Sequence, residues 1–269
     1  MKKKFVRFSS LLIALIMVLS LCACGSEEEE KIEYKSPVPT TTEEILARFN
    51  AALEGTKKGN PGISYSIDQK ASMSGEQKDK CENDYVKAAF KTLAKSITKG
   101  ENFAKETAYG DSTKDIFPTV GSDNTVALTS SDIRSAYFMD NKDDGTGATY
   151  IIVINIYPEK DPDQNNSIYG KLYNIMDDKE ILSHFDVINS VVSVKSYSTQ
   201  YGIGTIRAVL KKDTDQLTEL KLSREVIVST ELTGVGTLKD LGTVPLEFTY
   251  NSTENYSIDW FDPATRNAE

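Results

Sequence analysis

Alternation of apolar and polar residues marks the second half of this chain. Such a two-residue period predicts a strand with one buried face, and it recurs over residues 191–197, 203–211, 217–232 and 244–256. A hairpin precedes these stretches, with strands expected over 134–139 and 148–157 around an acidic turn. The second strand of the hairpin is apolar on both faces, which is typical of a strand covered on both sides. These patterns predict a long-stranded, curved antiparallel sheet.

Apolar residues with helical spacing appear before and within this strand-rich half. Thr41 and Glu44 have the spacing of a capping box, which predicts a helix over 42–54 that ends at Gly55 or Gly59. The other expected elements are a strand over 63–67, a loop over 68–79, a helix over 80–99, an irregular stretch over 101–124 and short helices over 167–176 and 178–185. The expected fold class is α+β, a half-barrel-like sheet with the N-terminal and mid-chain helices packed on one face.

The N-terminus has the pattern of an export signal. A basic start is followed by the apolar run Leu11–Leu21, whose eleven residues are too few for a membrane-spanning helix, which needs about 20. The run ends in Leu21-Cys22-Ala23-Cys24, which resembles the bacterial lipobox, with Leu21 at its aliphatic position and Ala23 at its small one. The resemblance implies cleavage after residue 23 and a lipid on Cys24. An ordinary signal peptide cleaved at the same place is the alternative.

These patterns divide the chain into four parts. We expect a lipoprotein signal peptide over 1–23, an acidic flexible tether over 24–40, a single α+β domain over 41–262 and a disordered tail over 263–269. The consecutive glutamates of the tether repel one another and stay solvated. The expected location is the outer face of the cytoplasmic membrane, with the membrane as a partner through the lipid on Cys24.

Charge and cysteine content narrow the class of protein further. The signal peptide carries four positive charges and no acid, so its removal takes the formal net charge from −9 to −13. A chain this acidic is unsuited to nucleic acid, and no nucleic-acid partner is expected. Cys81 would be the one cysteine left beside the lipidated one. We expect it to be a small buried side chain, with a reactive thiol as the alternative.

The chain offers little for catalysis. His184 is the one histidine in the sequence, so a Ser-His-Asp or Cys-His unit must use it, and no serine lies in a Gly-x-Ser-x-Gly elbow. We expect His184 to make a contact at a helix end instead. Ser96-Ile97-Thr98-Lys99 matches the Ser-x-x-Lys motif of penicillin-recognising enzymes, but the supporting motifs are missing, so we attribute the match to chance. The protein is therefore predicted not to be an enzyme.

The remaining candidates for binding sites are two acidic loops and two glycine pairs. Asp140–Gly145 has Lys142 where a calcium-binding EF-hand loop needs an oxygen ligand, so it is interpreted as a hairpin turn. The loop over 161–166 is interpreted as a solvated surface loop, with weak calcium binding as the alternative. Gly202-x-Gly204 and Gly234-x-Gly236 are too short for phosphate loops and predict strand bends. No metal and no cofactor are expected.

The segment Phe117-Pro118-Thr119-Val120-Gly121, with Leu128-Thr129 and Asp132 after it, resembles a group of uncharacterised cell-surface lipoproteins of Gram-positive bacteria. The likeness covers most of residues 42–260, and none of its motifs is catalytic. The fold of the group is similar in outline to half-barrel lipoproteins that carry lipid between a curved sheet and its helices. This second likeness is an analogy of fold alone.

Three functions are consistent with these observations. The first is a non-enzymatic lipoprotein that binds a lipid or other apolar ligand between helix and sheet, which requires a cavity of roughly 300 Å³ or more. The second is an envelope protein that contacts another protein or has a structural role, and the third is a hydrolase. Tyrosines in or beside the strands are ordinary packing residues or, alternatively, line an apolar groove: Tyr150, Tyr157, Tyr197, Tyr201, Tyr250 and Tyr256.

Overall fold

The computed structural model describes residues 32–81, 83–98, 103–143, 145–173, 175 and 178–261. The expected signal peptide, residues 24–31 of the expected tether, which include Cys24, and the expected tail lie outside these residues. The chain divides into two compact units, residues 1–33 and 34–269, and the fold described below is that of the second. Within the described ranges, no helix is both long enough and apolar enough to cross a membrane.

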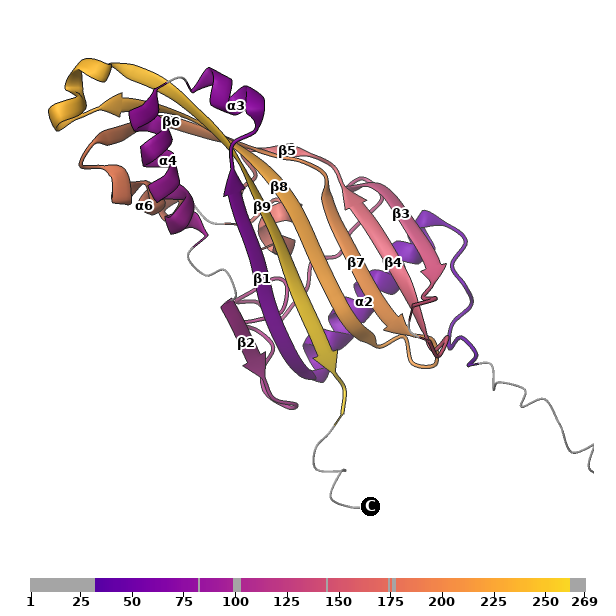
Figure 1. Cartoon of the computed structure of the whole chain (residues 1–269). Helices are drawn as coiled ribbons and strands as arrows, with labels where there is room; N and C mark the ends of the chain where they lie inside the picture. Colours follow the sequence, from indigo (N-terminus) through magenta and orange to yellow (C-terminus); the bar gives the residue numbers. More distant parts are fainter. Residues whose placement is uncertain are drawn as a thin grey trace, which may run out of the picture. The chain divides into compact units, whose positions relative to one another are not determined.

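In the described part of the chain, nine strands form one open antiparallel sheet, which confirms the α+β class and the curved sheet expected from the sequence (Figure 1). Its order is β2-β1-β9-β8-β7-β4-β3, and β6 pairs with β8 and with the short β5. The strands are β1 (Gly62–Ser72), β2 (Phe103–Thr107), β3 (Ile133–Asp140), β4 (Thr149–Ile156), β5 (Glu159–Lys160), β6 (Val192–Tyr201), β7 (Gly204–Lys211), β8 (Leu217–Gly234) and β9 (Thr243–Asp259).

Strand β8 changes its partner half-way along its length. It pairs with β7 over residues 217–223 and with β6 over 226–234. Strands β6 and β7 therefore act as one strand beside β8, interrupted at residues 202–203. We call this interruption, together with the facing residues 224–225 of β8, the waist of the sheet. The waist separates a wide half, which contains β1, β2, β3, β4 and β7, from a narrow half, which contains β5 and β6.

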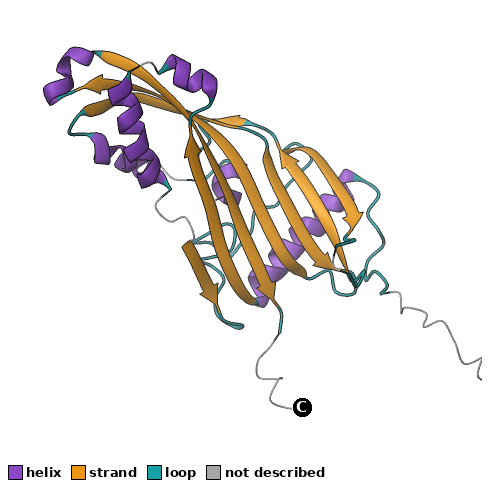
Figure 2. Cartoon of the chain, in the orientation of Figure 1, coloured by secondary structure: helices purple, strands orange, loops and turns teal. Residues whose placement is uncertain are grey.

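Most of the helices cover the inner face of the sheet; the exception is the helix that contains Gln77, whose side chain bonds to the outer-face residue Thr249 of β9. They are α2 (Thr42–Gly59), α3 (Gly75–Lys80), α4 (Asp84–Ile97), α5 (Ile168–Tyr173) and α6 (Asp178–Phe185), with 3-10 helices η1 (Asp186–Ile188) and η2 (Gly236–Leu241). Helix α2 crosses behind the wide half and contacts β3 and β8, while α4 and α6 contact each other at the narrow end (Figure 2). Each half of the sheet is therefore covered by a different set of helices.

Local capping explains where the first helix begins and ends. Thr41 and Glu44 make the expected capping box, in which each side chain accepts from the backbone of the other residue. Gly55 lies inside α2, which continues to Gly59 and is capped by Asn60 in the left-handed conformation at φ 46°. Asparagine tolerates this conformation better than most residues other than glycine.

The stretch after β1 differs from the expectation. We expected a loop over 68–79, whereas β1 continues to Ser72 because β9 pairs with it along its whole length. Ser74 and Gln77 then form a second capping box, which starts α3 inside the predicted loop. Strand β2 lies in the stretch expected to be irregular, where it pairs with β1.

The helix expected over 80–99 begins later than predicted. The Asn83 side chain accepts hydrogen bonds from the N–H groups of Tyr85 and Val86, so α4 starts directly after it. An N-cap satisfies N–H groups that have no partner within the helix, and this position therefore fixes the start. Cys81 consequently follows α3 instead of lying on the apolar stripe of α4, although it is buried as expected.

Residues of β8 and β9 alternate between a buried inner face and a more open outer face. Serine, threonine, asparagine and charged residues predominate on the outer face, while most inner positions are apolar and join the core beneath the helices. The inner positions around the middle of the two strands are Leu220, Leu222, Arg224, Val226, Val228, Phe248, Tyr250, Ser252, Glu254 and Tyr256. Three of these positions are therefore polar within an otherwise apolar or aromatic row.

Tyrosines of α5 fill the interruption at the waist. The Tyr169 hydroxyl donates to the carbonyl oxygen of Gly202 and accepts from the N–H of Gly204 at 2.8 Å. Burial raises the pKa of Tyr169 to about 12, so the hydroxyl stays protonated and makes both bonds at neutral pH. A Cβ on Gly204 would lie 2.7 Å from the Tyr173 hydroxyl oxygen. Glycine is needed here because the tyrosines approach the backbone closely.

Replacing Gly204 by alanine is expected to lower the free energy of unfolding by about 1–3 kcal/mol, because the methyl group would push apart fully buried rings. Urea denaturation measures this loss. Gly55→Ala is the matched control: nothing lies within 4 Å of its added Cβ, and alanine in a helix interior is expected to stabilise by about 0.5–1 kcal/mol. Equal stability of the Gly204→Ala protein and the unmodified protein would contradict the close packing at the waist.

Candidate ligand-binding site

A buried ion pair lies on the inner face of the sheet at the waist. Arg224 of β8 and Glu254 of β9 have side chains that are only 6 % and 4 % exposed, and their nearest charged atoms are 3.6 Å apart. The same guanidinium donates to the backbone oxygen of Tyr173 in α5 at 2.6 Å. Glu254 also accepts from the Tyr256 hydroxyl at 2.8 Å. The pair therefore connects both long strands with α5.

Burial dominates the electrostatics of this pair. It raises the pKa of the Glu254 carboxyl, while the Arg224 guanidinium and the Tyr256 hydroxyl act in the opposite direction. For Arg224, burial is the largest effect and favours the neutral form, but Glu254 and the neighbouring tyrosines Tyr201, Tyr250 and Tyr173 together outweigh it, so the pKa is raised. The two charges thus depend on each other, and the removal of one leaves the other buried without compensation.

Two buried polar atoms beside the pair have no hydrogen-bond partner among the described residues. They are Nε of Arg224 and the hydroxyl oxygen of Ser252. Ser252 pairs directly with Arg224 across β8 and β9, and its residue is only 2 % exposed. An unsatisfied buried donor costs about 1–3 kcal/mol. Such atoms are uncommon in folded proteins.

An apolar pocket lies next to Arg224 on the narrow side of the waist. It has a volume of about 60 Å³ and lies between α4, α6 and strands β6, β8 and β9. Its lining residues are Ile97, Ile181, His184, Phe185, Thr199, Tyr201, Arg224, Val226, Val228, Phe248 and Tyr250. The strand residues are buried, whereas Ile97, Ile181 and His184 are half-buried. The pocket therefore opens between the two helices and has Arg224 on its sheet side.

The structure brings together two residues that the sequence presented separately. The hydroxyl oxygen of Ser96 lies 3.2 Å from Nδ1 of His184, so α4 and α6 are joined at the mouth of the pocket. A serine nucleophile also needs N–H donors for the oxyanion that forms during acyl transfer. Ser96 lies in the last turn of α4, where carbonyl groups, not N–H groups, lack helical partners. The contact is therefore better suited to holding the helices together than to catalysis.

The other sequence candidates serve local structure. Burial raises the pKa of the Cys81 thiol, which disfavours the reactive thiolate. In the loop over 161–166, a carboxylate oxygen of Asp161 accepts from the N–H of Thr199 at 2.6 Å, and one of Asp163 accepts from the N–H groups of Asn165 and Asn166. These oxygens accept hydrogen bonds from backbone N–H groups and so stabilise the turn. The carboxylate of Asp140, at the start of the other acidic loop, binds Lys212 at 2.9 Å and the Tyr34 hydroxyl.

The segment that carries the resemblance to surface lipoproteins also has a structural role. The Nζ atom of Lys57 in α2 lies 3.1, 3.2 and 3.3 Å from the carbonyl oxygens of Phe117, Pro118 and Thr119. Asn50 of the same helix exchanges two hydrogen bonds with the backbone of Leu128. This segment therefore holds α2 in place and contributes no group to the apolar pocket.

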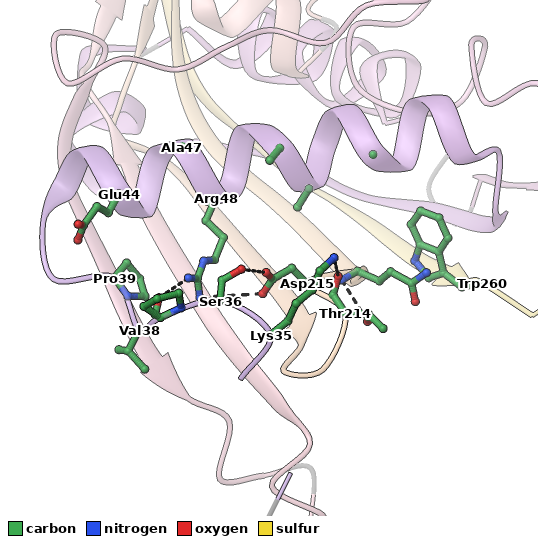
Figure 3. A pocket seen from close by; sticks show the side chains of 15 residues that line it. Lys35, Ser36, Val38, Pro39, Glu44, Ala47, Arg48, Thr214, Asp215 and Trp260 are labelled. Carbon is green, nitrogen blue, oxygen red and sulfur yellow. Dashed lines mark hydrogen bonds and ion pairs between the residues drawn. The ribbon is translucent and has the colours of Figure 1, made fainter. Parts of the chain in front are cut away.

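A second, open groove runs along α2, with a volume of about 600 Å³ (Figure 3). The chain just before α2 forms one wall. Ser36 donates to Asp215 at 2.6 Å, the Lys35 N–H donates to the Lys212 carbonyl at 2.6 Å, and Arg48 donates to the Pro37 carbonyl. We expected the flexible tether to reach residue 40, whereas residues 34–37 are already bonded to the folded unit. The composition of the segment predicted a tether, whereas its backbone and the Ser36 side chain bond to residues distant in sequence.

The residues at the centre of the candidate site were missed at the level of sequence. Arg224, Ser252 and Glu254 fall in phase with the apolar positions of their strands. A polar or charged residue in phase with a buried face is the signal that would have identified them, because burying a polar group is costly unless it is hydrogen-bonded or, for a charge, paired. Of the tyrosines weighed as ligand lining, Tyr201 and Tyr250 line the pocket. No family model, no curated protein and no solved structure matches this chain.

The pairing at the waist is tested by removing one charge and then both. Arg224→Met is expected to lower the free energy of unfolding by about 3–5 kcal/mol, because Glu254 remains buried without its partner. The double variant Arg224→Met/Glu254→Leu is expected to be more stable than the single variant. Chemical denaturation of the three proteins measures the difference. A double variant that is less stable than Arg224→Met would contradict the mutual dependence of the two charges.

Proposed function

We propose that this protein is a membrane-anchored, extracytoplasmic lipoprotein that is held by lipid on Cys24 and binds an apolar ligand without acting on it chemically. The observation that supports the binding role is the apolar pocket between α4, α6 and the inner face of the sheet. Concave, mostly apolar sites with a few convergent polar groups are the usual form of a small-molecule site. The lipobox resemblance supports the membrane address.

The size of the pocket restricts what enters it. Its volume of about 60 Å³ is well below the roughly 300 Å³ that we required for a lipid site. About 10–15 Å³ of such space holds one water molecule, so the pocket accommodates a group of about four heavy atoms. A whole acyl lipid does not fit in it. The proposal is therefore that the end of an apolar molecule enters the pocket and the rest leaves between α4 and α6.

Contact with another protein is the second candidate function, and one observation favours it. Tyr137 and Met139 on the edge strand β3 are 52 % and 46 % exposed. Met139 pairs with Ile151, which pairs with Val209 on β7. Ile151 and Val209 are buried but lie outside the main core. Tyr137 and Met139 therefore form a small exposed apolar area on an open sheet edge, a type of surface on which another chain can pair.

Native mass spectrometry on the chain from residue 32 onward tests the binding proposal. After incubation with a membrane lipid extract, we expect an added mass that organic solvent releases. Ile181→Trp places a large ring at the mouth of the pocket and is expected to abolish the added mass. Leu182→Trp is the matched control, because Leu182 lies next to Ile181 but is 42 % exposed and does not line the pocket.

Either of two results would contradict the binding proposal. One is a mass equal to that of the protein alone for all three proteins, and the other is equal loading of the two tryptophan variants. The first result, combined with a dimer or a larger species in the same spectra, would favour the function in protein contact instead.

A further inference from the structure

Strand β3 forms one edge of the sheet (Figure 1). Asn141, which follows β3, donates from its N–H to the carbonyl oxygen of Thr149 at the start of β4. In an antiparallel pair every second residue bonds to the neighbouring strand, so the residues of β3 alternate between those that bond to β4 and those whose backbone groups face the open edge. The residues that face the edge are Ala136, Phe138 and Asp140. Within the described part of the chain, no other segment bonds to their backbone on that side.

We propose that this edge pairs with β3 of a second copy of the chain, in an antiparallel and two-fold symmetric arrangement centred on Tyr137. Two-fold symmetry lets one surface serve both copies and is the commonest form of self-association. With Tyr137 on the axis, Ala136 of each copy lies opposite Phe138 of the other. Both residues face the edge, so each of these pairs exchanges two backbone hydrogen bonds, as when a strand is added to a sheet.

This inference goes beyond the binding proposal and does not depend on it. Strand β3 belongs to the wide half of the sheet, whereas the apolar pocket lies between α4, α6 and strands that continue into the narrow half. The inference also gives the second candidate function a defined partner, which is the chain itself.

The charged residues around the edge select this register. Residues 132–142 carry alternating acids and bases, which are Asp132, Arg134, Asp140 and Lys142. An axis at Tyr137 places Arg134 opposite Asp140 and Asp132 opposite Lys142. Moving the axis by one residue also keeps edge-facing residues opposite each other, but an axis at Ala136 opposes Asp132 to Asp140, and one at Phe138 opposes Arg134 to Lys142. Opposite charges at facing positions stabilise a strand pair and like charges destabilise it.

The side chains near the axis are available for this contact. Tyr137 and Met139 are 52 % and 46 % exposed and lie on the outer face, where the two tyrosines would meet across the axis. Arg134 is exposed and makes no ion pair with another described residue. The net charge of −9 opposes self-association, but the four charges of residues 132–142 balance one another. The copies therefore meet at a surface without excess charge.

A β-bulge limits the length of the paired region. The register between β3 and β4 shifts between Ile133 and Ser135, which makes Arg134 the extra residue. Regular backbone pairing is therefore confined to residues 135–140, and Arg134 contributes through its side chain alone. Bulges and charges at a sheet edge restrict which strands can pair with it, so the contact is specific to a strand of complementary charge pattern.

Cysteine cross-linking on the full chain in phosphatidylcholine vesicles tests the pairing. In the proposed register the two copies of Tyr137 form a pair without mutual backbone bonds, whose Cα atoms are about 4.5 Å apart, a separation that suits a disulfide. Tyr137→Cys is therefore expected to form a dimer on mild oxidation. Mass spectrometry of the peptides identifies the link through position 137, and the unmodified protein, oxidised in parallel, controls for its own cysteines.

Met139→Cys is the matched control. Met139 is exposed on the same face of β3, but in the proposed register its two copies are shifted by four residues along the strands, about 13 Å. This separation is too large for a disulfide, so we expect at least about tenfold less cross-linked dimer than for Tyr137→Cys.

A charge variant tests the register itself. Arg134→Glu, added to Tyr137→Cys, is expected to lower the dimer yield about tenfold, because both symmetric pairs with Asp140 become repulsive. Lys221→Glu is its control, since it makes the same change of charge at an exposed position of β8, away from the edge. Hydrogen exchange of the unmodified protein adds a measurement without cysteine: the N–H groups of Ala136 and Phe138 are expected to gain protection as the protein concentration rises.

Three results would overturn this inference. A Tyr137→Cys protein that stays monomeric under oxidation would exclude a second copy and leave the edge for a strand of another protein. Equal cross-linking of Tyr137→Cys and Met139→Cys would indicate random collision instead of a register. Equal dimer yields with Arg134→Glu and Lys221→Glu would exclude the selection by charge. None of these results bears on the apolar pocket, which is tested by the added mass of its ligand.

Discussion

The pairing of Arg224 with Glu254 is the constraint on which the centre of this fold depends. Both residues lie on strands that run through the wide and the narrow half of the sheet, at the point where β8 exchanges β7 for β6. The ends of β6 and β7 leave a break there, and α5 fills it with tyrosine side chains that bond to the exposed backbone. The ion pair lies next to this break. Arg224 connects the two, because it also donates a hydrogen bond to the backbone of α5.

The two halves of the sheet are covered by different helices. The wide half is covered by α2, which is held by Lys57 and Asn50 and bordered by the chain that leads from the N-terminus. The narrow half is covered by α4 and α6, which meet through Ser96 and His184 above the apolar pocket. Residues 35–37, which precede α2, bond to the wide half of the sheet and to α2 itself.

Local patterns were sufficient to predict most of the elements but not their pairing. The alternation along β8 and β9 and the capping box of Thr41 and Glu44 identified long strands and the first helix, because these signals lie in adjacent residues. The sequence predicted that α4 begins at residue 80, because the apolar helical spacing extends that far. The helix begins later because the Asn83 side chain caps it. The break between β6 and β7 depends on contacts with β8 and α5 distant in sequence. Arg224 and Glu254 could have been recognised as buried from their phase, but their contact could not.

A high-resolution crystal structure of the protein purified from membranes tests the central claim most directly. The account predicts non-protein density for an apolar group in the pocket, with the rest of the molecule leaving between α4 and α6. It would be contradicted by a pocket that is closed by side chains and contains no such density.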